Sequence, residues 1–244
     1  MLDQISDPRL SEELIAHRGT VTYLDYLSTV ERTIGAQSYL EIGTQQGASL
    51  AAVSCASIAI DPCLALSREV VGKKPACLLF QMTSDDFFKT YDPVQLLQRK
   101  LDLAFLDGMH LYEFLLRDII NTERCCHGKS VIALHDCLPP TFEMTSRQCR
   151  GATLNDRYLN YWTGDVWKVI PILQKYRTDM KIAYIDAPPT GLVLLTNLDP
   201  SSRVLSTSYD RIVEDFRESP DDFDQLRSVL RRITLTSGMQ QPVF

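Results

Sequence analysis

The sequence predicts an α/β protein built on one doubly wound, mostly parallel sheet of about seven strands. Short apolar runs of β-type residues alternate along the chain with segments of helical periodicity, which favours a sheet covered by helices on both faces. The 244 residues are 45% hydrophobic and 23% charged, a composition that suits one large globular domain with a full core. Polar residues stand at the ends of four apolar runs, where open α/β sheets bind their ligands.

The first half of the chain is expected to hold three strands. Residues 9–34 are predicted to form a helix, because apolar residues recur at intervals of three from Val21 to Val30. A glycine-bearing turn after the first strand leads into a helix of small residues, and Asp61-Pro62 ends the second strand. The predicted elements after the first helix are strands over 38–42, 57–60 and 76–82, a helix over 48–55 and a helical turn over 85–91.

The second half is expected to complete the sheet. Gly128 is the predicted stop of the helix that follows the fourth strand, and Asp165 is the predicted cap of a later helix. The link Ala-Pro-Pro-Thr-Gly between the last two strands is short enough for an antiparallel hairpin. The predicted elements are strands over 101–106, 130–134, 181–185 and 192–196, helices over 111–125 and 165–176, and a polar helical tail over 207–233.

These elements divide the chain into three parts. Residues 1–35 are expected to form an N-terminal helical cap, 36–200 the core, and 201–244 a C-terminal helical tail. The two ends could cover a site or pair subunits in a homo-oligomer. Residues 141–164 show no regular pattern, and the aromatic side chains in and just after this segment could form either a substrate lid or a satellite hydrophobic cluster. The aromatic residues concerned are Tyr158, Tyr161, Trp162 and Trp167.

Charge and cysteine usage exclude several classes of function. With 31 acidic and 25 basic residues the formal charge is −6, so no global field favours nucleic acid or an anionic membrane. The sequence shows no apolar run of about 20 residues and no signal-peptide pattern at its start. The seven cysteines lack metal-site spacing and read as small buried hydrophobes in a reducing compartment, which predicts a cytoplasmic protein. His17 and His127 are expected at the surface.

The turn after the first strand carries the first functional signal. Its glycines, Gly43 and Gly47, have neither the GxGxxG spacing of a dinucleotide site nor the Gly-Lys-Ser/Thr of a P-loop. Glu41 beside them would repel a pyrophosphate and attract an ammonium or sulfonium group. Asp61 ends the second strand, where a carboxylate can accept hydrogen bonds from both hydroxyls of a ribose. The combination predicts a cationic nucleoside, and S-adenosylmethionine is the common one.

The residues after the fourth predicted strand carry the most specific motif in the chain. Asp107-Gly108-Met109-His110-Leu111-Tyr112 reads Asp-Gly-x-His-x-Tyr, and with this motif the chain resembles a group of class I S-adenosylmethionine-dependent methyltransferases. The resemblance covers residues 36–137 best. It implies a Rossmann-like sheet of seven strands in the order 3-2-1-4-5-7-6, with strand 7 antiparallel.

The resemblance also implies how the cofactor is held. Gly43 and Gly47 would face its methionine part and Asp61 its ribose, and Ser84 or Asp85 would lie near adenine, although Asp85 could equally be a helix cap. The full set of expected cofactor-binding residues is Glu41, Gly43, Thr44, Gly47, Ser49, Asp61, Ser84, Asp85 and Asp107.

Related sugar and catechol O-methyltransferases bind magnesium, and the matching ligands here would be Asp107 and Asp136. Two carboxylates facing one cavity repel each other unless a cation or proton separates them. Such a metal could hold two oxygens of a vicinal diol and lower the pKa of a hydroxyl. The chain departs from the sugar-methyltransferase pattern at His135, which stands in place of an acid and could still ligate a metal, although a nitrogen matches magnesium poorly.

The expected catalytic residues are Asp107, His110 and His135. His110 could be a general base or a substrate contact, or it could be a structural histidine bonded to Asp118. We expect methyl transfer from S-adenosylmethionine to an oxygen of a small hydroxylated acceptor by in-line displacement. The alternatives are a catalytically inactive scaffold of the same fold and a nicotinamide-dependent oxidoreductase, against which Glu41 and the missing GxGxxG argue.

Overall fold

A computed structural model describes residues 9–10, 12–149, 158, 161–218 and 222–240. Parts of the predicted cap, of the 141–164 segment and of the C-terminal tail therefore lie outside the described residues. The strands are β1 (Ser38–Ile42), β2 (Ala56–Ile60), β3 (Cys77–Phe80), β4 (Leu101–Leu106), β5 (Cys126–His135), β6 (Lys181–Asp186), β7 (Leu192–Thr196) and β8 (Leu235–Ser237).

These strands form one sheet in the order β3-β2-β1-β4-β5-β7-β6-β8. Strand β7 is antiparallel to both of its neighbours, and the other pairs are parallel. The predicted order and the predicted antiparallel strand are confirmed. The eighth strand, which pairs with β6 beyond the expected edge, was not predicted because three residues carry too little periodicity to be recognised.

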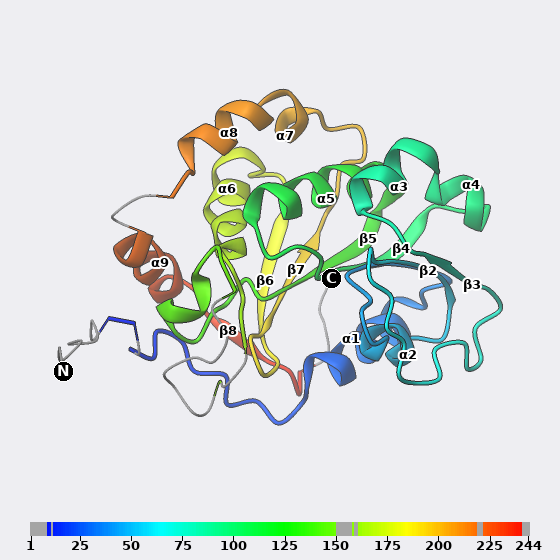
Figure 1. Ribbon diagram of the computed structural model, residues 1–244, viewed down its shortest axis with the longest axis horizontal. Helices are drawn as coiled ribbons and strands as arrows, with labels where there is room; N and C mark the ends of the chain where they lie inside the picture. The colour runs from blue at the N-terminus through cyan, green and yellow to red at the C-terminus, as the bar shows by residue number, and fades with distance from the viewer. Residues whose placement is uncertain (1–8, 11, 150–157, 159–160, 219–221, 241–244) are drawn as a thin grey trace.

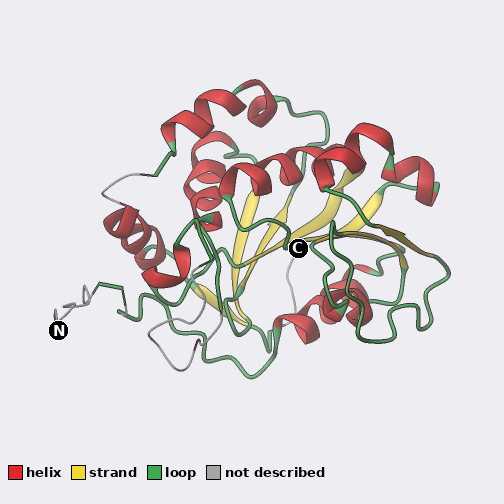
Figure 2. Cartoon of the chain, in the orientation of Figure 1, coloured by secondary structure: helices red, strands yellow, loops and turns green. Residues whose placement is uncertain are grey.

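Helices cover both faces of the sheet, as the alternating pattern predicted (Figures 1 and 2). α1 (Tyr23–Ile34) and α2 (Ala48–Ala52) lie on one face. The other face carries α3 (Ser84–Thr90), α4 (Pro93–Leu97), α5 (Tyr112–Cys125), α6 (Val169–Tyr176), α7 (Val204–Thr207) and α8 (Tyr209–Asp215), and α9 (Asp222–Arg231) packs its apolar face into the same core. Adjacent residues of β1 point into opposite cores, with Tyr39 under α1 and Leu40 under α5.

The predicted helix over 9–34 is wrong in its first half. α1 begins at Tyr23, where the hydroxyl of Thr22 accepts a hydrogen bond from the backbone N–H of Asp25. The described residues before it are not helical, and the chain there pairs through Glu13 with Thr141. This extended path brings His17 under the sheet, where it is 3% exposed and its Nε2 lies 2.9 Å from the carbonyl of Leu138. The prediction of a surface position for His17 is therefore wrong.

Gly128 and Asp165 have roles in the fold that differ from the predicted ones. The helix after β4 ends at Cys125, and Gly128 lies inside β5 instead of stopping the helix. Asp165 does not cap the 3-10 turn that it precedes, η3 (Val166–Lys168). Its carboxylate accepts the backbone N–H of Tyr112 at 3.1 Å, so it caps the start of α5 across the fold.

The remaining helix boundaries differ by a few residues. The helix predicted over 48–55 ends at Ala52, and α4, with Asp92 as cap and Pro93 at its first turn, was not predicted. None of the helices in the described part of the chain is long and apolar enough to span a bilayer.

Candidate functional site

The carboxyl ends of β1 to β4 open into a cavity of about 650 Å³, within the range for small-molecule sites. Six of the predicted catalytic and cofactor-binding residues lie on its wall, which are Gly43, Asp61, Ser84, Asp85, Asp107 and His110. The further lining residues are Ile42, Gln45, Ile60, Pro62, Cys63, Ala65, Thr83, Gly108, Met109, Phe114, Asp118 and Trp162. The cavity thus lies at the sheet edge where the strand-end polar residues were expected to meet.

The floor of the cavity depends on a glycine at position 43. Gly43 has a φ of +90°, and a Cβ atom there would come within 1.9 Å of the carbonyl oxygen of Asp107. Its N–H donates to the carbonyl of Ile60 at 2.9 Å, while the N–H of Asp107 donates to the carbonyl of Ile42 at the same distance. The ends of β1, β2 and β4 therefore touch at one point, which leaves no room for a side chain.

Asp61 ties the first two turns together. Its Oδ2 accepts the N–H of Gln45 at 2.7 Å and its Oδ1 accepts the N–H of Cys63 at 2.7 Å. Each carboxylate oxygen can accept a second hydrogen bond, and the side chain lies on the cavity wall. The residue that was expected to bind ribose is therefore also the one that fixes the shape of the turn.

Four of the predicted cofactor-binding residues do not line the cavity. Glu41, Thr44 and Ser49 are buried, and the Cβ direction of Gly47 points at Val70. The hydroxyl of Tyr39 donates to Glu41 at 2.6 Å, and burial raises the pKa of the Glu41 carboxyl to about 7. These four residues lie around the turn but outside the cavity lining. The structure therefore does not place Glu41 in contact with a ligand in the cavity.

A further acid, Asp118, lines the cavity, although the sequence suggested it only as a partner of His110. Asp118 is 3% exposed, and burial raises the pKa of its carboxyl to about 7. It lies on the inward face of α5, and a carboxylate among the apolar positions of an amphipathic helix was the signal that could have revealed it. Nearby, Asp85 forms a two-pronged ion pair with Arg117, at distances of 2.7–3.2 Å.

The other end of the cavity carries a cluster of two aspartates and two histidines. The Nε2 atom of His110 lies 3.4 Å from Oδ1 of Asp107 and 3.3 Å from Oδ2 of Asp136. The Nδ1 atom of His135 lies 3.3 Å from Oδ1 of each aspartate. His110 and Asp107 line the cavity, and His135 lies behind them, where its ring packs 4.3 Å from that of Tyr23.

The charges in this cluster stabilise one another. Burial alone would lower the pKa of His110, but Asp107 and Asp136 raise it to about 9. Burial likewise opposes the charged form of His135, and the same two carboxylates raise its pKa well above the ordinary value. The two imidazoles in turn overcome the effect of burial on Asp107 and lower its pKa to about 2. With no other cation bound, His110 is protonated at neutral pH and is a poor proton acceptor.

Distant segments hold this cluster in place. The ring of His110 donates through Nδ1 to the carbonyl of Trp162 at 2.7 Å, and the two rings pack at 4.9 Å. Asp136 adopts a φ of +59°, and its Oδ1 accepts the hydroxyl of Thr190 at 2.7 Å. A Cβ on Gly164 would meet the carbonyl oxygen of His110 at 1.7 Å, so the segment after Trp162 crosses directly over that residue. His110 therefore contacts Trp162 and the two aspartates, and Asp118 is not among these contacts.

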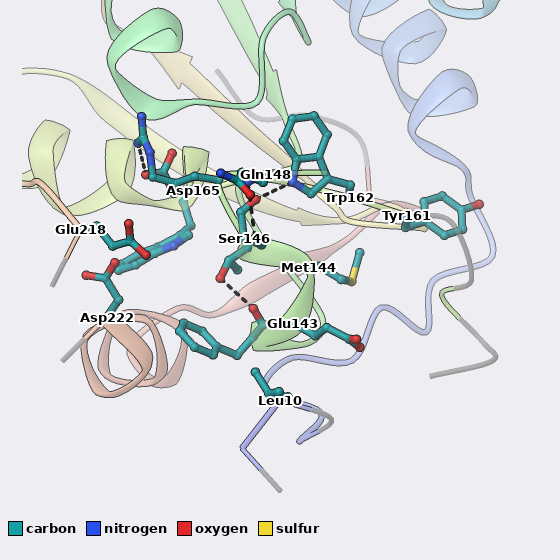
Figure 3. A pocket seen from close by; sticks show the side chains of 14 residues that line it. Leu10, Glu143, Met144, Ser146, Gln148, Tyr161, Trp162, Asp165, Glu218 and Asp222 are labelled. Carbon is teal, nitrogen blue, oxygen red and sulfur yellow. Dashed lines mark hydrogen bonds and ion pairs between the residues drawn. The ribbon is translucent and has the colours of Figure 1, made fainter. Parts of the chain in front are cut away.

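Trp162 lines both the large cavity and a second one of about 240 Å³, whose lining residues are drawn in Figure 3. Figure 3 shows its indole nitrogen directed at Ser146, whose carbonyl accepts the N–H. Tyr161 and Trp167 also line the second cavity, whereas Tyr158 is buried and lines neither cavity. The aromatic residues of this region therefore divide between lining and packing roles.

The cluster offers a donor set for a divalent cation. One atom from each of Asp107, His110 and Asp136 lies within 4.8 Å of the other two. Two carboxylates and one imidazole fit such a cation chemically, and Oδ1 of Asp107 is buried without a hydrogen-bond partner among the described residues. The two ligands expected from the sequence are therefore neighbours in the fold, and His110 is added to them.

Comparisons with known proteins agree with this fold. Residues 40–137 match a family described as a methyltransferase domain. The fold is similar to that of the methyltransferase PaMTH1 from Podospora anserina, solved with S-adenosylhomocysteine bound, at 17% identity and a TM-score of 0.52 over 72% of this chain and 78% of that one. A Klebsiella pneumoniae protein designated an O-methyltransferase aligns at 12% identity and a TM-score of 0.50, over 71% and 79% of the two chains. No curated protein matches the sequence.

Proposed function

We propose that this chain, whose residues 40–137 match a methyltransferase domain, is a class I S-adenosylmethionine-dependent methyltransferase that methylates an oxygen of a small hydroxylated acceptor. The observation that carries the proposal is the shape of the 650 Å³ cavity. One end is closed by a glycine turn with a ribose-type carboxylate, and the other end is lined by Asp107 and His110 of the charged cluster. A nucleoside cofactor and a polar acceptor can thus meet inside one cavity.

The proposed cofactor half runs from Asp85 to Gly43. Asp61 accepts hydrogen bonds from ribose hydroxyls with the lone pairs that the two backbone N–H groups leave free. Ser84 and Asp85 lie at the adenine end, beside the apolar side chain of Phe114. The backbone at Gly43 lets the methionine part pass close to the sheet edge. When bound, S-adenosylmethionine supplies a methyl group activated by a sulfonium.

The proposed acceptor half is the charged cluster. Asp107, which lines the cavity, orients the acceptor hydroxyl toward the methyl group and accepts its hydrogen bond, while Asp136 holds His110 beside it. His135 touches both carboxylates from behind and does not line the cavity, so we assign it a positioning role. A divalent cation held by Asp107 and Asp136 would lower the pKa of a bound hydroxyl. Trp162 and Met109 limit the entry of water at this end.

The cysteines and the cavity volume support a cellular location and a size of acceptor. All seven cysteines are free, and thiols of this number are typical of a reducing compartment such as the cytoplasm. A cavity of this volume holds a cofactor and a small molecule, which supports small acceptors over macromolecules.

A transfer assay tests the proposal. The purified protein is incubated with S-adenosylmethionine labelled in its methyl group, with and without divalent cations, and with a panel of catechols and sugars. We expect label on an acceptor oxygen, located by mass spectrometry, and its loss in Asp107→Asn. Label on nitrogen or carbon acceptors would overturn the assignment of an oxygen nucleophile. Folded protein that fails to bind S-adenosylmethionine would overturn the proposal as a whole.

A further inference from the structure

Three neighbouring side chains, two of which line the cavity, direct polar atoms at one another. The Nε2 atom of His110 is 3.4 Å from the nearest oxygen of Asp107 and 3.3 Å from that of Asp136. Direct charge-assisted hydrogen bonds from nitrogen to carboxylate are shorter, at about 2.7–2.9 Å. Donor atoms that share one cation at about 2.0–2.3 Å are separated by about 3.0–3.6 Å. The two observed spacings fall in this range, and the three donor atoms all lie within 4.8 Å of one another.

Each of two ligands is fixed by a contact on its far side. The Nδ1 atom of His110 is engaged with the carbonyl of Trp162 at 2.7 Å, which directs Nε2 at the two carboxylates. Oδ1 of Asp136 accepts the hydroxyl of Thr190 at 2.7 Å, which leaves Oδ2 facing His110. Metal-binding histidines characteristically donate their other ring N–H to a carbonyl in this way, and ligating carboxylates are themselves hydrogen-bonded.

Two buried polar atoms of the same cluster face each other at 3.3 Å without forming a hydrogen bond. The Nδ1 atom of His135 and Oδ1 of Asp107 are both buried and make no hydrogen bond within the described part of the chain. His135 is only 8% exposed, and its Nδ1 is directed at the two aspartates. Buried polar atoms that lack partners are uncommon, and an ion is one accepted reason for them.

The nitrogen decides which cation fits. Magnesium takes oxygen ligands in near-octahedral geometry and gains little from an imidazole. First-row transition metals bind imidazole well, and their affinity for mixed nitrogen and oxygen sites exceeds that of magnesium. We propose that His110, with Asp107 and Asp136, completes a three-ligand site that binds a first-row divalent transition metal in preference to magnesium. This inference deepens the proposed function, because the cation would lie where the acceptor oxygens are expected.

Binding measurements with manganese and magnesium test the inference without relying on activity. Protein stripped of metal is titrated with Mn²⁺, followed by electron paramagnetic resonance of the free ion and by calorimetry, and then with Mg²⁺. We expect the Kd for Mn²⁺ to be at least about tenfold lower than that for Mg²⁺. In His110→Gln the affinity for Mn²⁺ should fall about 10- to 100-fold, while that for Mg²⁺ should change by less than about threefold. Asp136→Asn should lose both ions.

His127→Gln is the matched control, because His127 is also paired with an aspartate, Asp102, but lies outside the cavity lining. It should bind Mn²⁺ like the wild type, and thermal unfolding establishes that each variant is folded. Equal affinities for the two ions, unchanged Mn²⁺ affinity in His110→Gln, or no Mn²⁺ binding by the wild type at about 1 mM would each overturn the inference. A parallel titration with S-adenosylmethionine separates this failure from that of the proposed function, because a protein that binds no Mn²⁺ but still binds the cofactor overturns only the metal inference.

Discussion

The two ends of the large cavity are built in different ways. At the glycine turn, Asp61 bonds to backbone groups only 2 and 16 residues away, and the strands concerned are adjacent in the sheet. At the charged cluster, His110 depends on Trp162, 52 residues along the chain, and Asp136 on Thr190, 54 residues along. The first end is shaped by backbone conformation and the second by charges held from a distance. Substitutions should therefore affect stability at the first end and chemistry at the second.

The largest effect is expected at the charged end. Asp107→Asn removes one of the two carboxylates that face His110, and should lower the rate of methyl transfer about 100- to 1000-fold. The affinity for S-adenosylmethionine should change little, since the ribose and adenine contacts remain. Kinetics and calorimetry on the same samples check both expectations, with the exposed Asp210→Asn as control. Full activity in Asp107→Asn would remove this residue from the mechanism.

Substitution in the glycine turn should lower the stability of the fold. Gly43→Ala places a Cβ atom within 1.9 Å of a backbone oxygen at a φ of +90°, and should cost about 3 kcal/mol or more of unfolding free energy. Gly35→Ala is the matched control, because Gly35 also has a positive φ, +62°, but its Cβ would meet nothing within 4 Å. That variant should cost about 1 kcal/mol. Equal losses in urea unfolding would show that the close approach at position 43 has no special role.

A smaller effect should separate positioning from packing. Thr190→Val keeps the volume of a fully buried side chain and removes its hydrogen bond to Asp136. We expect kcat to fall about tenfold, within the range for losing one hydrogen bond to a charged group, with little change in KM for the cofactor. Thr190→Ser, which retains the hydroxyl, should recover most of the rate. If valine and serine variants behave alike, the hydroxyl does not position Asp136.

The buried acid beneath the turn should make stability depend on pH. Burial raises the pKa of Glu41 from its ordinary value of 4.5 to about 7, so the folded state holds a proton that the unfolded state releases. Its contribution to the unfolding free energy therefore declines as pH rises from about 4.5 to 7. Glu41→Gln should be the more stable protein above pH 7, by about 1 kcal/mol or more, and should lose this advantage near pH 5. Parallel denaturation curves at both pH values would contradict the assignment.

The difference between the two ends of the cavity also explains which features could be predicted from the sequence. The strand order and the positions of Gly43 and Asp61 follow from apolar runs and turn residues that are close in the chain. The contacts of His110 with Trp162 and of Asp136 with Thr190 join segments without a shared periodicity, so local patterns could not reveal them. Asp165 illustrates this limit of local patterns. Aspartate is a common cap residue, but this one caps a helix that begins more than 50 residues earlier in the chain.

Protection of one cysteine tests the location of the cofactor most directly. Cys63 is exposed and lines the large cavity, whereas Cys149 is exposed elsewhere and serves as an internal control. Alkylation of both thiols by iodoacetamide is followed by mass spectrometry with and without S-adenosylmethionine. At ten times the Kd we expect the alkylation of Cys63 to slow about tenfold, with no change at Cys149. Unchanged alkylation of Cys63 under saturating cofactor would contradict the assignment of this cavity.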